Sequence, residues 1–157
     1  MAKAKSELVT WSSTFSVGIK LIDEQHKGLL ELVNDMFNHA VGDAAVERVY
    51  FQSVIQKAVN YVKIHFATEE KIMIATKFSG YREHKKAHDT FVLTVVENIR
   101  DFEAGRKFSL STFTKFLKEW VLTHIAIMDK QYFEYFKKIA SRKADGRLSI
   151  TSADVRR

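Results

Sequence analysis

Residues 61–73 have the sequence YVKIHFATEEKIM, in which a histidine stands among apolar residues. In an α-helix His65 and Glu69, four positions apart, lie about 40° from each other and so share one face. The apolar neighbours of this pair predict that the shared face points inward. Burying an imidazole beside a carboxylate is costly unless both are paired, so the pair needs a chemical reason.

The same helical periodicity extends over most of the chain. Apolar stripes predict helices at about 21–40, 44–76 and 81–104, and a fourth from Ser109 or Ser111 to about 139. The breaks between them are Gly42-Asp43, Ser79-Gly80 and Gly105. There is no proline and there are only 6 glycines, as expected of long helices. Short connections predict an all-α fold, an antiparallel up-down-up-down four-helix bundle.

The two ends of the chain differ from this helical body. Residues 1–20 are rich in Ser, Thr and β-branched residues without a helical stripe, and predict an extended N-terminal arm. We expect one domain, residues 1–140 with the arm, followed by a short mobile basic tail at 141–157. Of the net charge of +6, residues 137–157 carry +5, from seven Lys or Arg against two Asp. The body is therefore nearly neutral, which argues against a nucleic-acid partner.

Several classes of protein are excluded by what the chain lacks. It has no cysteine, which rules out disulfides, thiolate metal sites and cysteine nucleophiles. No run approaches the ~18 apolar residues of a membrane span, and the N-terminus has no signal-peptide core. These features predict a cytoplasmic protein without a membrane span.

Five of the six histidines fall on the predicted inner stripes: His26, His65, His84, His88 and His124. A lone inward histidine is more often a hydrogen-bonded core residue. Five of them on four helices would cost several kcal/mol without a common partner. A metal ion is such a partner, because neutral imidazole binds Fe, Zn, Cu and Ni. The remaining His39 and the acidic Glu70 are expected on solvated faces.

The spacings sharpen the metal hypothesis. His65 and Glu69, like His84 and His88, are four residues apart and share a face. On the fourth helix the spacing from His124 to Asp129 is five, which corresponds to about 140° on an ideal helix. Either the two side chains converge from opposite flanks, or a π-bulge brings Asp129 back over His124.

In this order and spacing, the seven residues resemble the hemerythrin family, especially its single-domain bacterial members. The resemblance covers about residues 8–138 and includes Trp11 and the run 23–26, DEQH. It implies a non-haem di-iron site of Fe2+ or Fe3+ ions with a bridging oxo or hydroxo group. In that site His84, His88 and His124 would bind one iron, His26 and His65 the other, and Glu69 and Asp129 would bridge them.

By this resemblance the second iron keeps an open position for O₂. The implied function is reversible O₂ binding for storage, delivery or buffering, and not enzymatic turnover. A protein that receives the oxygen is a possible partner, and a monomer is favoured. The inner faces carry no Glu-x-x-His motif of the carboxylate-rich di-iron enzymes. Two alternatives stay open: an O₂ or redox sensor that acts through a partner, and a di-iron enzyme handling peroxide or nitric oxide. A bundle with a non-functional zinc site is the least favoured interpretation.

An apolar pocket is expected around the open iron, because water there would promote oxidation of the site. Similarity to the family suggests Leu29, Phe66, Trp120 and Ile125 as its walls, although each is equally compatible with ordinary core packing. Tyr132, three residues after Asp129, is expected to hydrogen-bond a bridging carboxylate.

Overall fold

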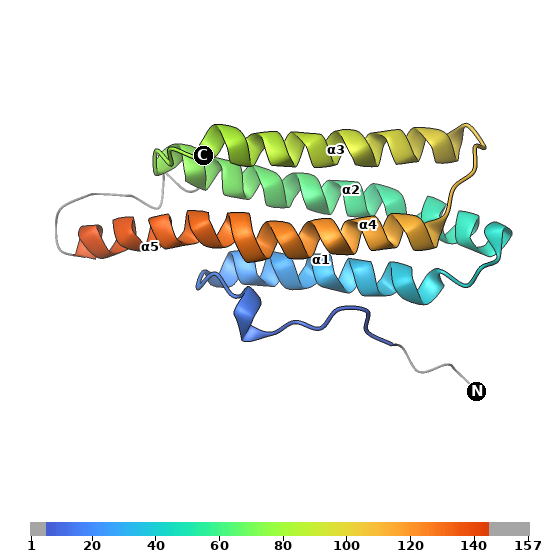
Figure 1. The fold of residues 1–157 in the computed structure, drawn as a ribbon, viewed down its shortest axis with the longest axis horizontal. Coiled ribbons are helices and arrows are strands. Elements are labelled where there is room, and N and C mark those ends of the chain that lie inside the picture. Colours follow the sequence, from blue (N-terminus) through green and yellow to red (C-terminus); the bar gives the residue numbers. More distant parts are fainter. Residues whose placement is uncertain (1–5, 145–157) are drawn as a thin grey trace.

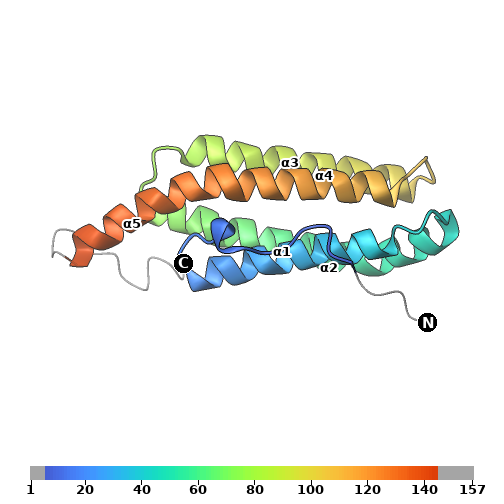
Figure 2. The ribbon, with the colours of Figure 1, turned by 60° about the horizontal axis from the view of Figure 1, so that its bottom comes forward.

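The computed structural model describes residues 6–144, which are mostly helical (Figure 1). The helices are α1 (Lys20–His39), α2 (Ala44–Ala75), α3 (Tyr81–Glu103), α4 (Leu110–Thr123) and α5 (Lys130–Ala144), with a π-helical segment, η2 (His124–Asp129), joining the last two. The part of the chain described contains no strand. Figure 2 shows α1 beside α2 in one layer and α3 beside α4 in the other. The predicted all-α, four-helix bundle is confirmed.

The helix ends follow from the residues at the breaks. The Asp43 carboxylate accepts hydrogen bonds from two backbone N–H groups in the first turn of α2, at 3.0 and 3.1 Å. Before it, Gly42 has a φ of 82°, in the left-handed region that glycine adopts at no steric cost. Ser109, not Ser111, is the N-cap of α4, and its hydroxyl accepts a 3.2 Å bond from the first turn.

The fourth helix is longer than the sequence predicted. The expected end was near residue 139, whereas α5 continues to Ala144. The reason is that no helix breaker occurs before Gly146. Residues 141–144, assigned to the tail, are therefore helical, which corrects that boundary. The rest of the predicted tail, 145–157, and the first five residues of the arm lie outside the described residues.

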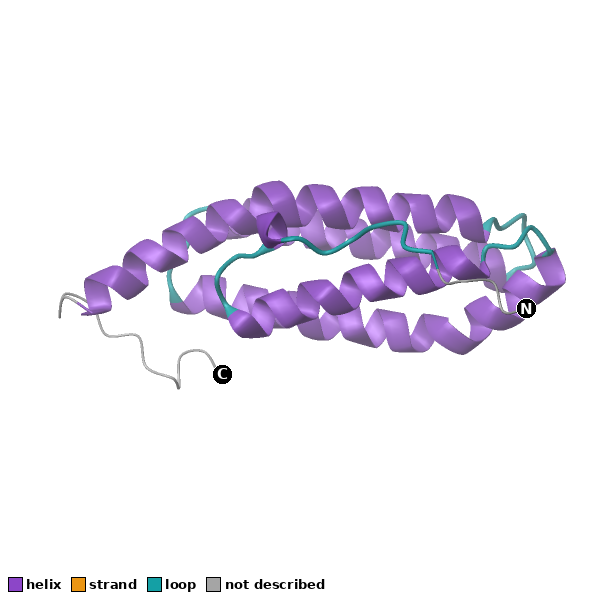
Figure 3. Cartoon of the chain, turned by 90° about the horizontal axis from the view of Figure 1, so that it is seen from below, coloured by secondary structure: helices purple, strands orange, loops and turns teal. Residues whose placement is uncertain are grey.

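The arm runs along the seam between α1 and the fourth helix (Figure 3). It is extended apart from one 3-10 turn, η1 (Ser13–Phe15). Asn34 of α1 anchors it, because the side-chain oxygen accepts bonds from the N–H groups of Leu8 and Val9, at 2.8 and 2.9 Å, and the amide donates to the Val9 carbonyl at 2.8 Å. The arm's apolar side chains cover a cluster formed by Leu29, Leu30, Val33, Val121 and Ile125.

Two further apolar clusters fill the ends of the bundle. The one near the α2–α3 turn contains Ile22, Ile72, Met73, Tyr132 and Phe133. The one at the opposite end contains Met36, Phe51, Phe102, Leu110 and Phe113. The polar interior described below lies between them. None of the described helices combines the length and the apolar character needed to cross a membrane.

Candidate metal centre

Five histidines and two carboxylates meet inside the bundle. The first three helices and the π-helical segment contribute: His26 from α1, His65 and Glu69 from α2, His84 and His88 from α3, His124 and Asp129 from η2. None of the seven residues is more than 4% exposed. The inward orientation predicted for the five histidines is confirmed. His39, by contrast, is exposed, as expected.

The Glu69 carboxylate divides its two oxygens between two groups of histidines. Its Oε1 lies 3.4 Å from His26 Nε2 and 3.2 Å from His65 Nε2. Its Oε2 lies 3.5 Å from His84 Nε2 and 3.2 Å from His88 Nε2. One side chain therefore spans both groups.

Asp129 divides its oxygens in the same way. Its Oδ2 lies 3.0 Å from His26 Nε2, while its Oδ1 lies 3.1 Å from the Nε2 atoms of His84 and His124. The two carboxylates thus join a two-histidine group (His26 and His65) to a three-histidine group (His84, His88 and His124).

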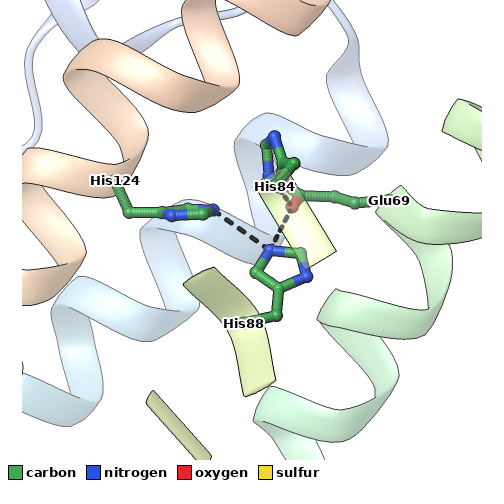
Figure 4. Close-up of side chains that lie close together, drawn as sticks. All are labelled: Glu69, His84, His88 and His124. Atoms are coloured by element: carbon green, nitrogen blue, oxygen red, sulfur yellow. Dashed lines mark hydrogen bonds and ion pairs between the residues drawn. The ribbon is translucent and has the colours of Figure 1, made fainter. Parts of the chain in front are cut away.

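The separations between donor atoms are those of ligands that share an ion. Figure 4 shows the three-histidine group with Glu69. The Nε2 atoms of His88 and His124 face each other at 3.1 Å. Two nitrogens at right angles on one ion, each about 2.1 Å from it, would be about 3.0 Å apart.

Many of these buried atoms also lack a hydrogen bond. In the described protein no partner satisfies either oxygen of Glu69 or Asp129, either ring nitrogen of His26, or Nε2 of His84. Leaving one such atom unsatisfied costs about 1–3 kcal/mol. A bound cation satisfies them together, and a mixed imidazole and carboxylate set suits iron. The residues present therefore fit a pair of metal ions.

The charges in the cluster favour cations. Burial opposes protonation of His26 and His84, but the carboxylates of Asp129 and Glu69 outweigh it and raise the pKa of each imidazole to about 9. Burial also opposes ionisation of Glu69 and Asp129, yet the surrounding histidines hold the pKa of both carboxyls below its usual value. For His124 burial prevails and lowers the pKa. Metal binding therefore displaces protons from the first two imidazoles.

Comparison with known protein families matches most of the chain. The family described as the hemerythrin HHE cation binding domain matches residues 17–136. The chain belongs to the hemerythrin family.

Individual hemerythrins match over most of their length. The bacteriohemerythrin of Stenotrophomonas maltophilia is 31% identical over 130 residues, 83% of this chain and 82% of the relative. That of Methylococcus capsulatus is 29% identical over 126 residues, 80% of this chain and 94% of the relative. A crystal structure of wild-type hemerythrin superposes with a TM-score of 0.74 at 27% identity, over 81% of this chain and 96% of that one. Family and fold support a non-haem di-iron protein of the O₂-binding type.

In this hemerythrin the π-helical segment explains how His124 and Asp129, five residues apart, reach the same cluster. The predicted π-bulge is confirmed, since η2 runs from His124 to Asp129. The wider turn brings a residue five positions on back over the first. As a result Asp129 Oδ1 reaches His124 Nε2 at 3.1 Å.

Two polar residues outside the predicted set orient the histidines. His65 Nδ1 lies 2.8 Å from Gln25 Oε1, and His88 Nδ1 lies 3.0 Å from Glu70 Oε1. An oxygen acceptor on Nδ1 places the ring hydrogen there and leaves the Nε2 lone pair facing the cluster. The expectation that Glu70 lies on a solvated face is wrong, because its side chain is 21% exposed and bonded to His88. Each residue is next to a ligand in the sequence, which was the one available signal.

The four residues predicted to line the pocket differ in what they contact. Leu29, Phe66 and Ile125 are buried. The Phe66 ring stacks on His88 with centroids 3.8 Å apart, and Trp120 stacks on His124 at 4.4 Å. These two rings thus cover two of the three histidines of the three-histidine group. That the four residues line a ligand pocket stays a prediction.

Tyr132 is fully buried, and its ring edge approaches His84 with centroids 6.4 Å apart. Burial raises the pKa of its phenol. The hydroxyl has no hydrogen-bond partner in the described part of the chain. Its bond to a bridging carboxylate stays a prediction.

Proposed function

We propose that this hemerythrin binds O₂ reversibly at a non-haem di-iron site, for oxygen storage, delivery or buffering. The ligands would be His84, His88 and His124 for one iron and His26 and His65 for the other, with Glu69 and Asp129 bridging alongside an oxo or hydroxo group. Bound in this donor set, two Fe2+ ions supply the two electrons that reversible O₂ binding needs.

One observation carries the proposal. Glu69 and Asp129 each give one oxygen to each histidine group, and the two groups differ in size by one imidazole. The smaller group, His26 and His65, offers one donor fewer, which would leave a coordination position free on the ion held there. Structural metal sites use a full set of protein ligands, whereas sites that bind small molecules keep such a position open.

The remaining side chains would hold the site dry and rigid. Leu29 and Ile125 are buried in the apolar cluster beneath the arm, and Phe66 lies in stacking contact with His88. A surrounding of low polarity strengthens attraction between opposite charges and so opposes their separation. These apolar side chains would therefore oppose the loss of a charged oxygen species from the site.

The same surroundings favour binding over turnover. Peroxide or nitric oxide chemistry requires a group that delivers protons. Leu29, Phe66 and Ile125, the buried side chains that we propose as pocket walls, carry none. We therefore propose a carrier or buffer of oxygen.

The test combines iron analysis with optical spectra of the anaerobically reduced protein, taken before O₂ is admitted, after admission and after removal. We expect two irons per chain and a visible band that appears and disappears with O₂. Asp129→Asn should lose both properties, whereas the exposed His39→Asn should keep them. Rapid irreversible oxidation would reject reversible binding and favour redox sensing or enzymatic turnover.

A further inference from the structure

The two histidine groups differ in the atoms that bind their outward nitrogens. In the two-histidine group, His65 Nδ1 bonds the neutral amide oxygen of Gln25 at 2.8 Å. In the three-histidine group, His88 Nδ1 bonds the carboxylate oxygen of Glu70 at 3.0 Å. In both rings Nε2 faces the cluster and Nδ1 faces away from it. The two histidines therefore differ in the charge of the group that accepts the hydrogen bond from Nδ1.

Glu70 is placed to act as an anion on His88. Its side chain is 21% exposed, and the His88 side chain it binds is 1% exposed. Lys85 interacts electrostatically with Glu70, but its ammonium is held by both oxygens of Asp89, at 2.9 and 3.0 Å. The contact of the Glu70 carboxylate is therefore with the His88 imidazole, while the Lys85 ammonium is bonded to Asp89.

Gln25 is held just as firmly, although without charge. Its backbone carbonyl accepts a 2.9 Å bond from the Tyr61 hydroxyl. Tyr61 can approach because Gly28 has no side chain: a Cβ there would lie 2.0 Å from the hydroxyl oxygen. The backbone of Gln25 is thus fixed against α2, and from there its amide oxygen reaches His65 Nδ1.

We propose that Glu70 and Gln25 are positioning residues that make the two metal positions electronically unequal. The Glu70 carboxylate polarises the Nδ1–H bond of His88, which makes that imidazole a stronger donor. A stronger donor stabilises Fe3+ more than Fe2+ because attraction grows with the charge of the ion. An iron at the three-histidine position would therefore be the more easily oxidised. An iron at the open two-histidine position would have the higher reduction potential.

The inference rests on the proposed di-iron function and is tested on the iron-loaded protein with three isosteric variants. Glu70→Gln removes the charge from His88, and Gln25→Glu adds one to His65. The control is Glu83→Gln, which removes a charge from an exposed residue next to His84. The readouts are the midpoint potentials of the iron pair and the rate of iron loss to a chelator.

Glu70→Gln should raise a midpoint potential by about 59 mV, equivalent to a tenfold change in a one-electron equilibrium. It should also lose iron at least about tenfold faster, the lower end of the effect of removing such a partner. Gln25→Glu should lower a potential by a similar amount, and Glu83→Gln should leave both readouts near those of the unaltered protein. The opposite signs of the first two variants separate this role from general destabilisation.

Equal shifts in Glu70→Gln and Glu83→Gln would overturn the inference, because they would show a general charge effect. A potential that rises in Gln25→Glu would overturn it as well. If the unaltered protein binds no iron pair, the proposed function fails, and this inference with it. If that protein loads iron and responds to O₂ while Glu70→Gln changes nothing, the inference alone fails.

Discussion

At position 28 helix α1 makes room for a side chain of α2. A Cβ on Gly28 would lie 2.0 Å from the hydroxyl oxygen of Tyr61 and 2.6 Å from its Cζ. Alanine favours helices more than glycine does, by roughly 1 kcal/mol. We nevertheless expect Gly28→Ala to lower the free energy of unfolding by about 1–3 kcal/mol, the usual cost of overpacking, as measured by urea denaturation.

A double-mutant cycle checks the cause. Tyr61→Phe keeps the ring and removes the oxygen that would lie nearest to the new methyl group. In that background Gly28→Ala should cost clearly less than it does alone. Fully additive costs would mean that the clash with Tyr61 is not the reason for the loss.

Leu29, one turn after His26, is a single side chain that we expect to exclude water from the site. It is 6% exposed and packs in the cluster beneath the arm. Leu29→Asn should bring a polar group and water towards the open position and raise the autoxidation rate of the oxygenated protein about tenfold or more, followed by optical spectra. Leu29→Met, which conserves volume and polarity, should stay close to the original rate. Equal autoxidation rates in the two variants would show that Leu29 does not line the pocket.

At the scale of elements, the arm depends on one asparagine. Asn34 makes three hydrogen bonds to the backbone of Leu8 and Val9, at 2.8–2.9 Å and partly buried. Asn34→Ala would leave these backbone groups unpaired under the arm. We expect a loss of about 1–3 kcal/mol in the free energy of unfolding and faster proteolysis within residues 6–12.

The matched control stands one turn further along α1. Asn38 bonds the backbone of Ser6 in the same manner, at 3.1 and 2.9 Å, but in an exposed position. Water can replace those bonds, so Asn38→Ala should cost less than about 1 kcal/mol. Equal losses in the two variants would show that the arm is not anchored chiefly at Asn34.

The elements also show how far the sequence alone can predict this molecule. Helix limits came from apolar periodicity and breakers, and both are local properties. The spacing of five between His124 and Asp129 allowed either convergence from opposite flanks or a π-bulge, and the π-helical segment decides for the bulge. Gln25 and Glu70 were missed, since a residue beside a ligand faces whichever helix packs there. Only the packing of α1 on α2 and of α2 on α3 reveals those bonds.

At the scale of the whole molecule, the donors come from every helix of the bundle, so metal binding and folding are coupled. Without a bound ion, His26, Glu69 and Asp129 would keep buried atoms that have no hydrogen-bond partner among the described residues. Iron would satisfy these atoms only when all four helices are in place. A ligand at a thousand times its dissociation constant adds about 4 kcal/mol to the free energy of unfolding if the unfolded chain does not bind it.

We therefore expect removal of iron by a chelator under reducing conditions to lower the Tm by roughly 10 °C, measured by circular dichroism. His39→Gln should preserve this difference, because His39 is exposed and outside the cluster. His26→Gln should diminish it, since that imidazole contacts both bridging carboxylates, at 3.0 and 3.4 Å. A Tm that does not depend on iron would mean that the bundle is held by its apolar clusters alone. The metal would then bind to a preformed site without stabilising the fold. The free-energy cost assigned to the unpaired buried atoms would be wrong.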